Sequence, residues 1–196
     1  TSALLCWQPR EQGLDFAIQS AATHGEMPMS MSFKFVPGFK VGMGMNFDHD
    51  NWDFLVSYTH LDTTESNYGD FPDTVAAWVI TPWFKHATTT VSPAIAYWHF
   101  NYNTYDLMLG RPSYVGTRLT FKPHAGLRFY TIDQKMTVSY VYSVTEGSSR
   151  TIKSFNKSEA FAFGPRLGFE GNWLLGSGFR MFGELAGNIS YQWFKV

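Results

Sequence analysis

The chain has no long hydrophobic run and almost no cysteine, and both absences narrow its class. No stretch of 18 apolar residues occurs among its 196 residues, so the sequence contains no candidate for a membrane-spanning helix. Residues 74–84 come nearest, but they include Pro82 and are too few to cross a bilayer as a helix. Cys6 is the only cysteine, which excludes an internal disulfide and a cysteine-based metal site.

Charge is scarce as well. Charged residues make up 16% of the chain, against about 25% in a typical soluble domain, whereas aromatic residues reach 18%. The formal net charge is −1 and there is no long basic cluster, so no nucleic-acid partner is expected. A chain that is poor in charge, rich in aromatics and without a hydrophobic helix is unusual for a soluble domain. It is typical of a β-barrel, whose polar lumen face dilutes the apolar residues.

Apolar residues occupy alternate positions over residues 31–47. Since successive side chains of a strand point to opposite faces, this segment has one apolar face and one small or hydrophilic face. The apolar positions are Met31, Phe33, Phe35, Pro37, Phe39, Val41, Met43, Met45 and Phe47. A two-faced strand about three times the usual length suits a barrel between lipid and a polar lumen. The pattern predicts an all-β fold, an antiparallel transmembrane β-barrel forming a single domain over residues 1–196.

The same alternation recurs along the chain, and none of these segments shows a sustained helical period. Predicted strands cover residues 31–47, 52–62, 74–84, 94–110, 116–131, 136–145, 158–173 and 179–194, with one or two more inside residues 2–19. The chain is therefore expected to hold about nine or ten strands. Near Asn103 the alternation slips, which we interpret as a β-bulge.

Turns between the strands are predicted to alternate between short and long. Tight connections are expected at 48–51, 132–135 and 174–178, which are rich in turn residues. Longer polar loops are expected at 62–73 and 146–157. Short turns at one rim and long loops at the other are typical of outer-membrane barrels.

The alternation also assigns strand residues to the lumen or to lipid. The predicted pore-lining residues are Lys34, Lys40, Arg118, Lys122, His124, Arg128, Arg166, Glu170, Arg180 and Glu184. The predicted lipid-facing residues are Phe39, Val41, Met43, Phe121, Leu127, Phe169, Trp173 and Trp193. A ladder of mixed charge is expected across neighbouring strands from Arg166, Glu170, Arg180 and Glu184. An anion-favouring patch is suggested by Arg118, Lys122 and Arg128. Such charges either bias ion passage or merely pair across strands and hold the sheet, and the sequence favours neither.

Signals for catalysis are poor, and no cofactor is expected. The six histidines show no metal-ligand pairing such as HExxH, so no metal site is predicted. His99 with Asp106, or the run from Asn188 to Ser190, are conceivable catalytic groups, but no nucleophile–base pair is identifiable. The sequence therefore predicts a protein that is not an enzyme.

Several short motifs resemble the Legionella-type major outer membrane protein family, to which chlamydial major outer membrane proteins are related. They lie in the same order over most of the chain, although each one alone is a weak motif. The matching residues are Trp7 with 10–15, 37–42, 50–53, 109–111, 123–128, 132–134 and 164–168. The resemblance implies a pore-forming β-barrel in the outer membrane of a Gram-negative bacterium, one that admits small hydrophilic solutes and ions. Outer-membrane lipid is then a further partner, and self-association as a homo-oligomer stays open.

Two departures from the family qualify what carries over. Chlamydial relatives are cysteine-rich and cross-linked, and with Cys6 alone this chain is not expected to share that role. Trp193 and Phe194 are followed by Lys195 and Val196, whereas a barrel usually ends on an aromatic residue. Because family members are also longer, we expect a fragment that is incomplete at its carboxy-terminal end and does not close a pore by itself.

Two other functions remain as alternatives to a diffusion pore. The first is a surface-exposed structural or adhesin barrel whose long loops bind a partner. The second is a soluble ligand-binding barrel of lipocalin type, which would be apolar inside and polar outside. Strand length and aromatic placement argue against the soluble barrel.

Overall fold

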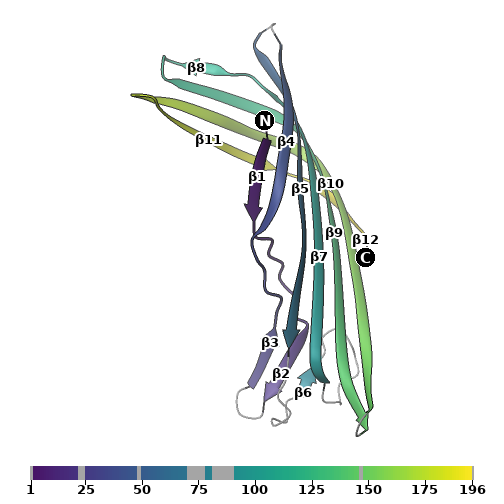
Figure 1. The fold of residues 1–196 in the computed structure, drawn as a ribbon. Helices are drawn as coiled ribbons and strands as arrows, with labels where there is room; N and C mark the ends of the chain where they lie inside the picture. Colours follow the sequence, from purple (N-terminus) through teal and green to yellow (C-terminus); the bar gives the residue numbers. More distant parts are fainter. Residues whose placement is uncertain are drawn as a thin grey trace.

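The computed structural model describes residues 2–21, 25–47, 50–69, 78–80, 91–145 and 148–195, and these residues form an all-β fold. The strands pair antiparallel, and the main sheet curls into an open half-barrel (Figure 1). The predicted fold class, an incomplete antiparallel β-barrel, is confirmed. No described segment forms a helix with the length and apolarity needed to cross a membrane.

The main sheet runs in the order β1-β4-β5-β7-β9-β10-β11, with β8 on β9 and β12 on β10. Its strands are β1 (Ser2–Trp7), β4 (Val36–Phe47), β5 (Trp52–Gly69), β7 (Val91–Gly110), β8 (Ser113–Val115), β9 (Leu119–Thr145), β10 (Ser148–Gly176), β11 (Phe179–Asn188) and β12 (Tyr191–Lys195). From β4 to β11 each strand pairs with the next long strand of the chain, so the sheet is an up-and-down meander. The edges carry β1 on one side and β11 with β12 on the other.

A second sheet of three short strands has the order β3-β2-β6. It consists of β2 (Ala17–Ala21), β3 (Gly25–Met29) and β6 (Trp78–Ile80). The strand predicted over 74–84 is thus described only as β6, which pairs with β2 instead of the main sheet. The rest of that predicted strand lies outside the described residues.

Strands β9 and β10 are much longer than predicted. They pair from Trp173 with Leu119 at one end to Ser148 with Thr145 at the other. Residues 132–135 lie inside β9, so the predicted tight turn there is wrong, and the predicted strands 116–131 and 136–145 are one strand. The predicted polar loop 146–157 is wrong as well, because β10 already begins at Ser148.

Two other boundaries differ from the sequence prediction. The predicted loop 62–73 is strand up to Gly69, where β5 ends, and residues 70–73 lie outside the described residues. The alternating segment predicted as a strand over 31–47 is a strand only from Val36 onward. Residues 30–35 are not in a strand, and Met31 is buried in a core. Polarity alone therefore misplaced the strand ends at this side of the sheet.

At the opposite side the predicted turns 48–51 and 174–178 are confirmed in part, because residues 48–49 lie outside the described residues and 174–176 belong to β10. Strands β4 and β5 are joined through Asp50 and Asn51, which both adopt positive φ, of 61° and 53°. That conformation is typical of a tight hairpin turn, and Asn and Asp tolerate it better than other non-glycine residues. Strands β10 and β11 are joined by Ser177 and Gly178, which also have positive φ.

The final predicted strand, 179–194, is also recovered, in two segments. Strand β11 pairs Asn188 with Arg166, and β12 pairs Tyr191 with Phe163, so both keep one register along the same edge of β10. The interruption lies opposite Pro165, which has no N–H to donate to the ladder.

Candidate functional site

One face of the sheet carries a continuous apolar surface near the short turns. This outer apolar band comprises residues 39–47 of β4, 52–58 of β5, 105–109 of β7, 119–129 of β9, 161–175 of β10 and 179–193 of β11 and β12, at every second position. All eight residues predicted to face lipid lie on it, with exposed fractions from 38% for Phe121 to 83% for Met43. Along β9 the band covers ten steps from Leu119 to Phe129. At roughly 3.3 Å a step and a tilt of about 45° this is roughly 23 Å of height, close to the apolar band of a transmembrane barrel.

Rows of aromatic rings border the band at the side away from the short turns. Tyr58 and Tyr105 stack with ring centroids 4.9 Å apart, and Phe129 and Phe163 lie 4.8 Å apart. Trp193 packs against Phe161 at 5.7 Å. Aromatic girdles of this kind mark the two interfaces of membrane barrels.

The opposite face, which we call the inner face, carries the charges. Side chains of strands two apart meet there, as they do on the concave side of a curled sheet. Eight of the ten predicted pore-lining residues lie on it within the strands. Lys34 and Arg118 do not, because Lys34 is outside any strand and Arg118 is in the turn between β8 and β9.

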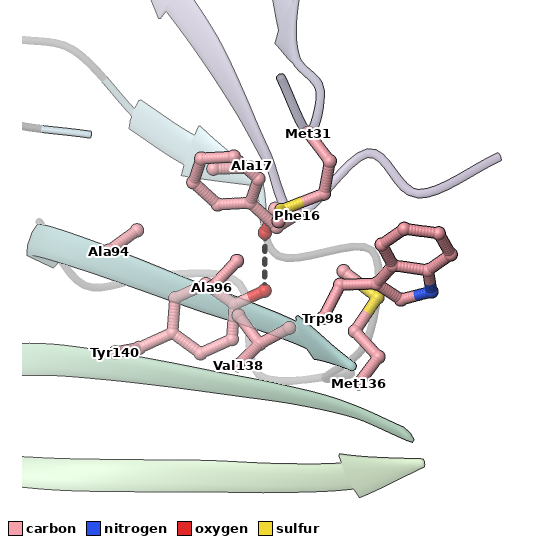
Figure 2. Close-up of a cluster of buried hydrophobic side chains, with 9 residues drawn as sticks. All are labelled: Phe16, Ala17, Met31, Ala94, Ala96, Trp98, Met136, Val138 and Tyr140. Atoms are coloured by element: carbon pink, nitrogen blue, oxygen red, sulfur yellow. Dashed lines mark hydrogen bonds between the residues drawn. The ribbon is translucent and has the colours of Figure 1, made fainter. Parts of the chain in front are cut away.

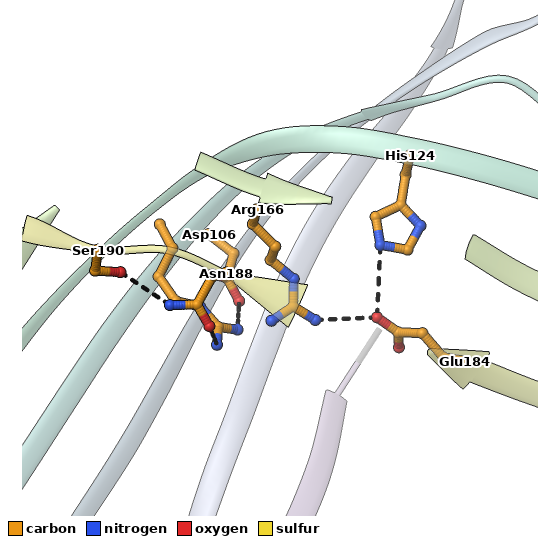
Figure 3. A network of polar contacts seen from close by, with 7 residues as sticks. Asp106, His124, Arg166, Glu184, Asn188 and Ser190 are labelled. Atoms are coloured by element: carbon orange, nitrogen blue, oxygen red, sulfur yellow. Dashed lines mark hydrogen bonds and ion pairs between the residues drawn. The ribbon is translucent and has the colours of Figure 1, made fainter. Parts of the chain in front are cut away.

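Asp106, labelled in Figure 3, and Arg128 form the most buried ion pair of the inner face among the described residues. They are direct cross-strand partners on β7 and β9. The guanidinium donates from Nε to Oδ1 at 2.5 Å and from Nη2 to Oδ2 at 2.7 Å, and a longer contact of 3.5 Å reaches the Asn188 side chain on β11. Since the Asp106 side chain is only 2% exposed, this two-point pairing keeps its charge from being buried alone.

Lys122 reaches over a whole strand to its partner. Its Nζ lies 2.7 Å from Oδ2 of Asp53, although Lys122 is on β9 and Asp53 on β5. The strand between them is β7, where Gly110 pairs with Asp53. A Cβ at Gly110 would lie 2.9 Å from Cε of Lys122, so the glycine makes room for the crossing side chain.

His124 uses the same arrangement on the other side of β9. It pairs with Gly168 of β10, and a Cβ at Gly168 would lie 2.5 Å from the His124 Nε2. The ring thus lies over β10 and brings Nε2 to 3.8 Å from Oε1 of Glu184 on β11, which also accepts a 3.1 Å hydrogen bond from Arg166 (Figure 3). His124 is buried, and neither ring nitrogen has a hydrogen-bond partner among the described residues.

The pairs change the predicted electrostatics of this face. Two members of the expected anion-favouring patch, Lys122 and Arg128, are neutralised by carboxylates, and the third, Arg118, lies in a turn. Of the expected ladder, Arg166 pairs with Glu184, while Arg180 stands opposite Leu174 and Glu170 opposite Glu184. The inner face is a mixed-charge surface.

The sidedness reverses where the same strands continue beyond the band. There the inner face is apolar, with Ala94, Ala96 and Trp98 on β7 and Met136, Val138 and Tyr140 on β9 (Figure 2). Phe16, Ala17 and Met31 of the amino-terminal part cover this surface. We call the described residues from 8 to 33 the cap.

The bulge proposed near Asn103 is wrong, because β7 and β9 pair without a register shift there.

Hydrogen bonds also hold the cap on the inner face. The Tyr140 hydroxyl donates to the Phe16 carbonyl at 2.5 Å, and burial raises the pKa of Tyr140 to about 12. Gln134 donates to Glu11 at 2.8 Å, and Asn67 donates to the Ser30 carbonyl at 2.8 Å. Three strands thus contribute to one docking surface.

The structure bears on one of the catalytic candidates, His99 with Asp106. His99 lies on the outer face and Asp106 on the inner face, so they cannot act together. No three His, Cys, Asp or Glu side chains of the described ranges gather as a metal site would require.

The predicted pore-lining set did not include Asp53 and Asn188, and Asp106 was interpreted only as a catalytic candidate. Their place in the alternation was a usable signal, because each shares its face with the basic residue that it contacts. The glycines opposite the long side chains were a second signal.

Comparison with known proteins agrees with this geometry. The family model described as Legionella pneumophila major outer membrane protein precursor matches residues 1–195. No curated protein and no solved structure gives a significant match. The match covers nearly the whole chain and places the protein in the bacterial outer membrane. The chain belongs to the family of the Legionella major outer membrane protein.

Proposed function

We propose that this protein forms the wall of an outer-membrane pore through which small hydrophilic solutes and ions diffuse passively, without a chemical step. The observation that supports it is the division between an exposed apolar band outside and a charged inner face behind it. Lipid stabilises the apolar band from outside, and a charged inner face of this kind suits a water-filled lumen.

In this proposal the paired charges shape the wall and the unpaired charges set its selectivity. Asp106, Arg128, Asp53 and Lys122 are held against the sheet by each other, so they fix the local field without extending into the passage. Lys40, Glu170 and Arg180 also lie on the inner face, and no salt bridge joins them to other described residues. They are the charges best placed to bias ion passage.

The cap narrows the proposed passage at the end away from the short turns. It covers the inner face of β7 and β9, so solutes must pass beside it. Because the described sheet has two free edges, the pore also needs further strands, from the same protein or from another copy, to close.

Conductance of the whole mature protein in planar bilayers tests the proposal. Stepwise single-channel currents are expected, and Glu170→Gln is expected to shift the reversal potential in a salt gradient toward anions. Lys40→Gln is expected to shift it toward cations. The matched control is Lys153→Gln, an exposed residue of β10 beyond the band, which should leave selectivity unchanged.

A correctly folded protein that stays silent would refute the pore and favour the surface-exposed structural or adhesin barrel. That alternative is weakened by the structure of its proposed loops, since 62–69 and 148–157 are strands. Currents with identical selectivity in all three variants would keep a pore but refute the inner face as its wall.

A further inference from the structure

A belt of charged residues crosses the outer face directly beyond the aromatic rows. Its first row joins Asp62, Asn101, Asp133, Glu159 and Lys195, which are successive cross-strand partners from β5 to β12. Its second row joins Thr64, His99, Lys135 and Lys157, again as direct partners. The belt therefore follows the border of the apolar band over five strands.

Three lysines of the belt surround one carboxylate. Lys157 forms an ion pair with Glu159, Lys195 stands opposite Glu159 across the ladder, and Lys135 stands opposite Lys157. These lysines, Lys157 first, hold the pKa of Glu159 below its usual value. A groove of about 340 Å³ lies here, lined by His99, Asn101, Asp133, Lys135, Lys157 and Glu159. Two of the three lysines, Lys135 and Lys157, thus line one groove, and Lys195 stands beside it, opposite Glu159.

The height of the belt matches the headgroup layer of a bilayer. Phe161 and Trp193 form the last aromatic pair, and Glu159 and Lys157 lie two and four residues before Phe161 on β10, on the side away from the band. At roughly 3.3 Å a residue and a tilt of about 45°, the two rows lie roughly 5 and 9 Å above that pair. The headgroup region adds about 5–8 Å to each side of the hydrocarbon core. Lysine side chains at this level can point back toward it.

We infer that Lys135, Lys157 and Lys195 form a binding site for the phosphate groups of outer-membrane lipids. The band holds the acyl chains of such a lipid, and the lysines donate charge-assisted hydrogen bonds to its phosphate oxygens in the groove above. Glu159 and Asp133 keep the lysine ammonium groups oriented when no lipid is bound. This inference does not depend on the proposed pore, since it concerns the opposite face of the sheet.

Lipid titration of the folded whole protein in an uncharged detergent tests the site. Diphosphorylated lipid A is the probe, phosphatidylcholine is the comparison lipid, and native mass spectrometry counts the bound molecules. A lysine near an anionic surface contributes roughly a fivefold increase in binding, so Lys135→Gln with Lys157→Gln should weaken lipid A binding about 25-fold. Phosphatidylcholine binding should stay the same because its phosphate is compensated by its own cation.

The matched control is Arg150→Gln with Lys153→Gln, which removes the same charge from exposed residues of β10 further from the band. This control is expected to keep lipid A binding within about twofold. The site is refuted if both double variants lose lipid A equally, or if the belt variant binds it as well as the unaltered protein. Each variant is first checked for its unaltered strand content by circular dichroism, since an exposed ion pair contributes little to stability.

Discussion

Two halves of the same strands follow opposite rules of sidedness. In the half near the short turns, β7 and β9 have Leu107 and Leu127 outside and Asp106 and Arg128 inside. In the other half the outside carries Asn101 and Lys135, and the inside carries buried Trp98 and Val138. The strands run through this change without a break in register.

The difference shows that the solvent around the sheet, and not the fold of the strand, decides which face is apolar. Where lipid surrounds the wall, apolar side chains are stable outside and polar ones must find partners inside. Beyond the bilayer, water surrounds the outer face, and the cap supplies an apolar partner for the inner face. One sheet thus has a membrane half and a conventionally packed half.

Removing Trp98 should have the largest effect, because it breaks the packed half at its centre. Trp98 is 1% exposed and packs edge-on against Phe33 of the cap with ring centroids 5.2 Å apart. Trp98→Ala is expected to cost about 3–5 kcal/mol of the stability with which the cap is held. Hydrogen exchange of residues 14–21 measures the loss. Trp193→Ala, on the exposed outer face, is the control, and equal protection of the cap in both variants would contradict the packing role.

Placing a charge on the outer face should separate the two halves directly. Leu127→Arg lies in the middle of the band and is expected to cost about 2–4 kcal/mol in a lipid bilayer. Ser139→Arg lies on the same face of the same strand, beyond the band, and should change stability by less than about 0.5 kcal/mol.

Denaturant unfolding from lipid vesicles, followed by tryptophan fluorescence, compares these two arginine variants. A cost for Ser139→Arg as large as that for Leu127→Arg would mean that lipid extends along the whole sheet. The assignment of the belt to the headgroup layer would then be wrong too.

The sequence pattern shows why the strand ends were misplaced while the fold class was predicted. Along β9 the apolar positions are odd up to Phe129 and even from Met136 onward, and this change was interpreted as a turn at 132–135. A period-two pattern changes phase at a turn, but it also does so where a strand leaves the membrane. Composition at the site does not distinguish these cases, because polar residues are favoured in both.

The site shows a similar limit. Alternation placed eight of ten charges on the inner face, because facing depends only on position along a strand. The partners depend on register between distant strands, so the contact of Lys122 with Asp53, 69 positions away in the chain, could not be predicted from either segment. Neither could the cap, whose contacts join the first 33 residues to β7 and β9.

Adding one methyl group at Gly168 should test the crossing of His124 over β10. A Cβ there would lie 2.5 Å from the His124 Nε2 and 2.7 Å from the Cβ of Ala186, so Gly168→Ala forces the ring or the strand to move. Overpacking of this kind costs about 1–3 kcal/mol. Gly171→Ala, three residues along the same strand with nothing within 4 Å of its added Cβ, is the control and should be nearly neutral. The midpoint of thermal unfolding in detergent is measured for both variants. Equal midpoints would contradict the position of the His124 ring over β10.

The smallest expected effect concerns a single hydroxyl that joins the two sides of the packed half. Tyr140→Phe removes the hydrogen bond to the Phe16 carbonyl and should weaken the cap by about 1 kcal/mol. Burial under the cap raises the pKa of Tyr140 from 10.0 to about 12. When the pH rises, the Tyr140 hydroxyl therefore ionises at a lower pH in molecules whose cap has detached than in molecules whose cap is in place. The contribution of Tyr140 is therefore complete below pH 10 and is lost as the pH rises from 10 to 12. Phenolate absorbance, recorded as the difference between unaltered protein and Tyr140→Phe, should show a midpoint near 12, and a midpoint at the ordinary tyrosine value would mean that the cap does not cover this ring in solution.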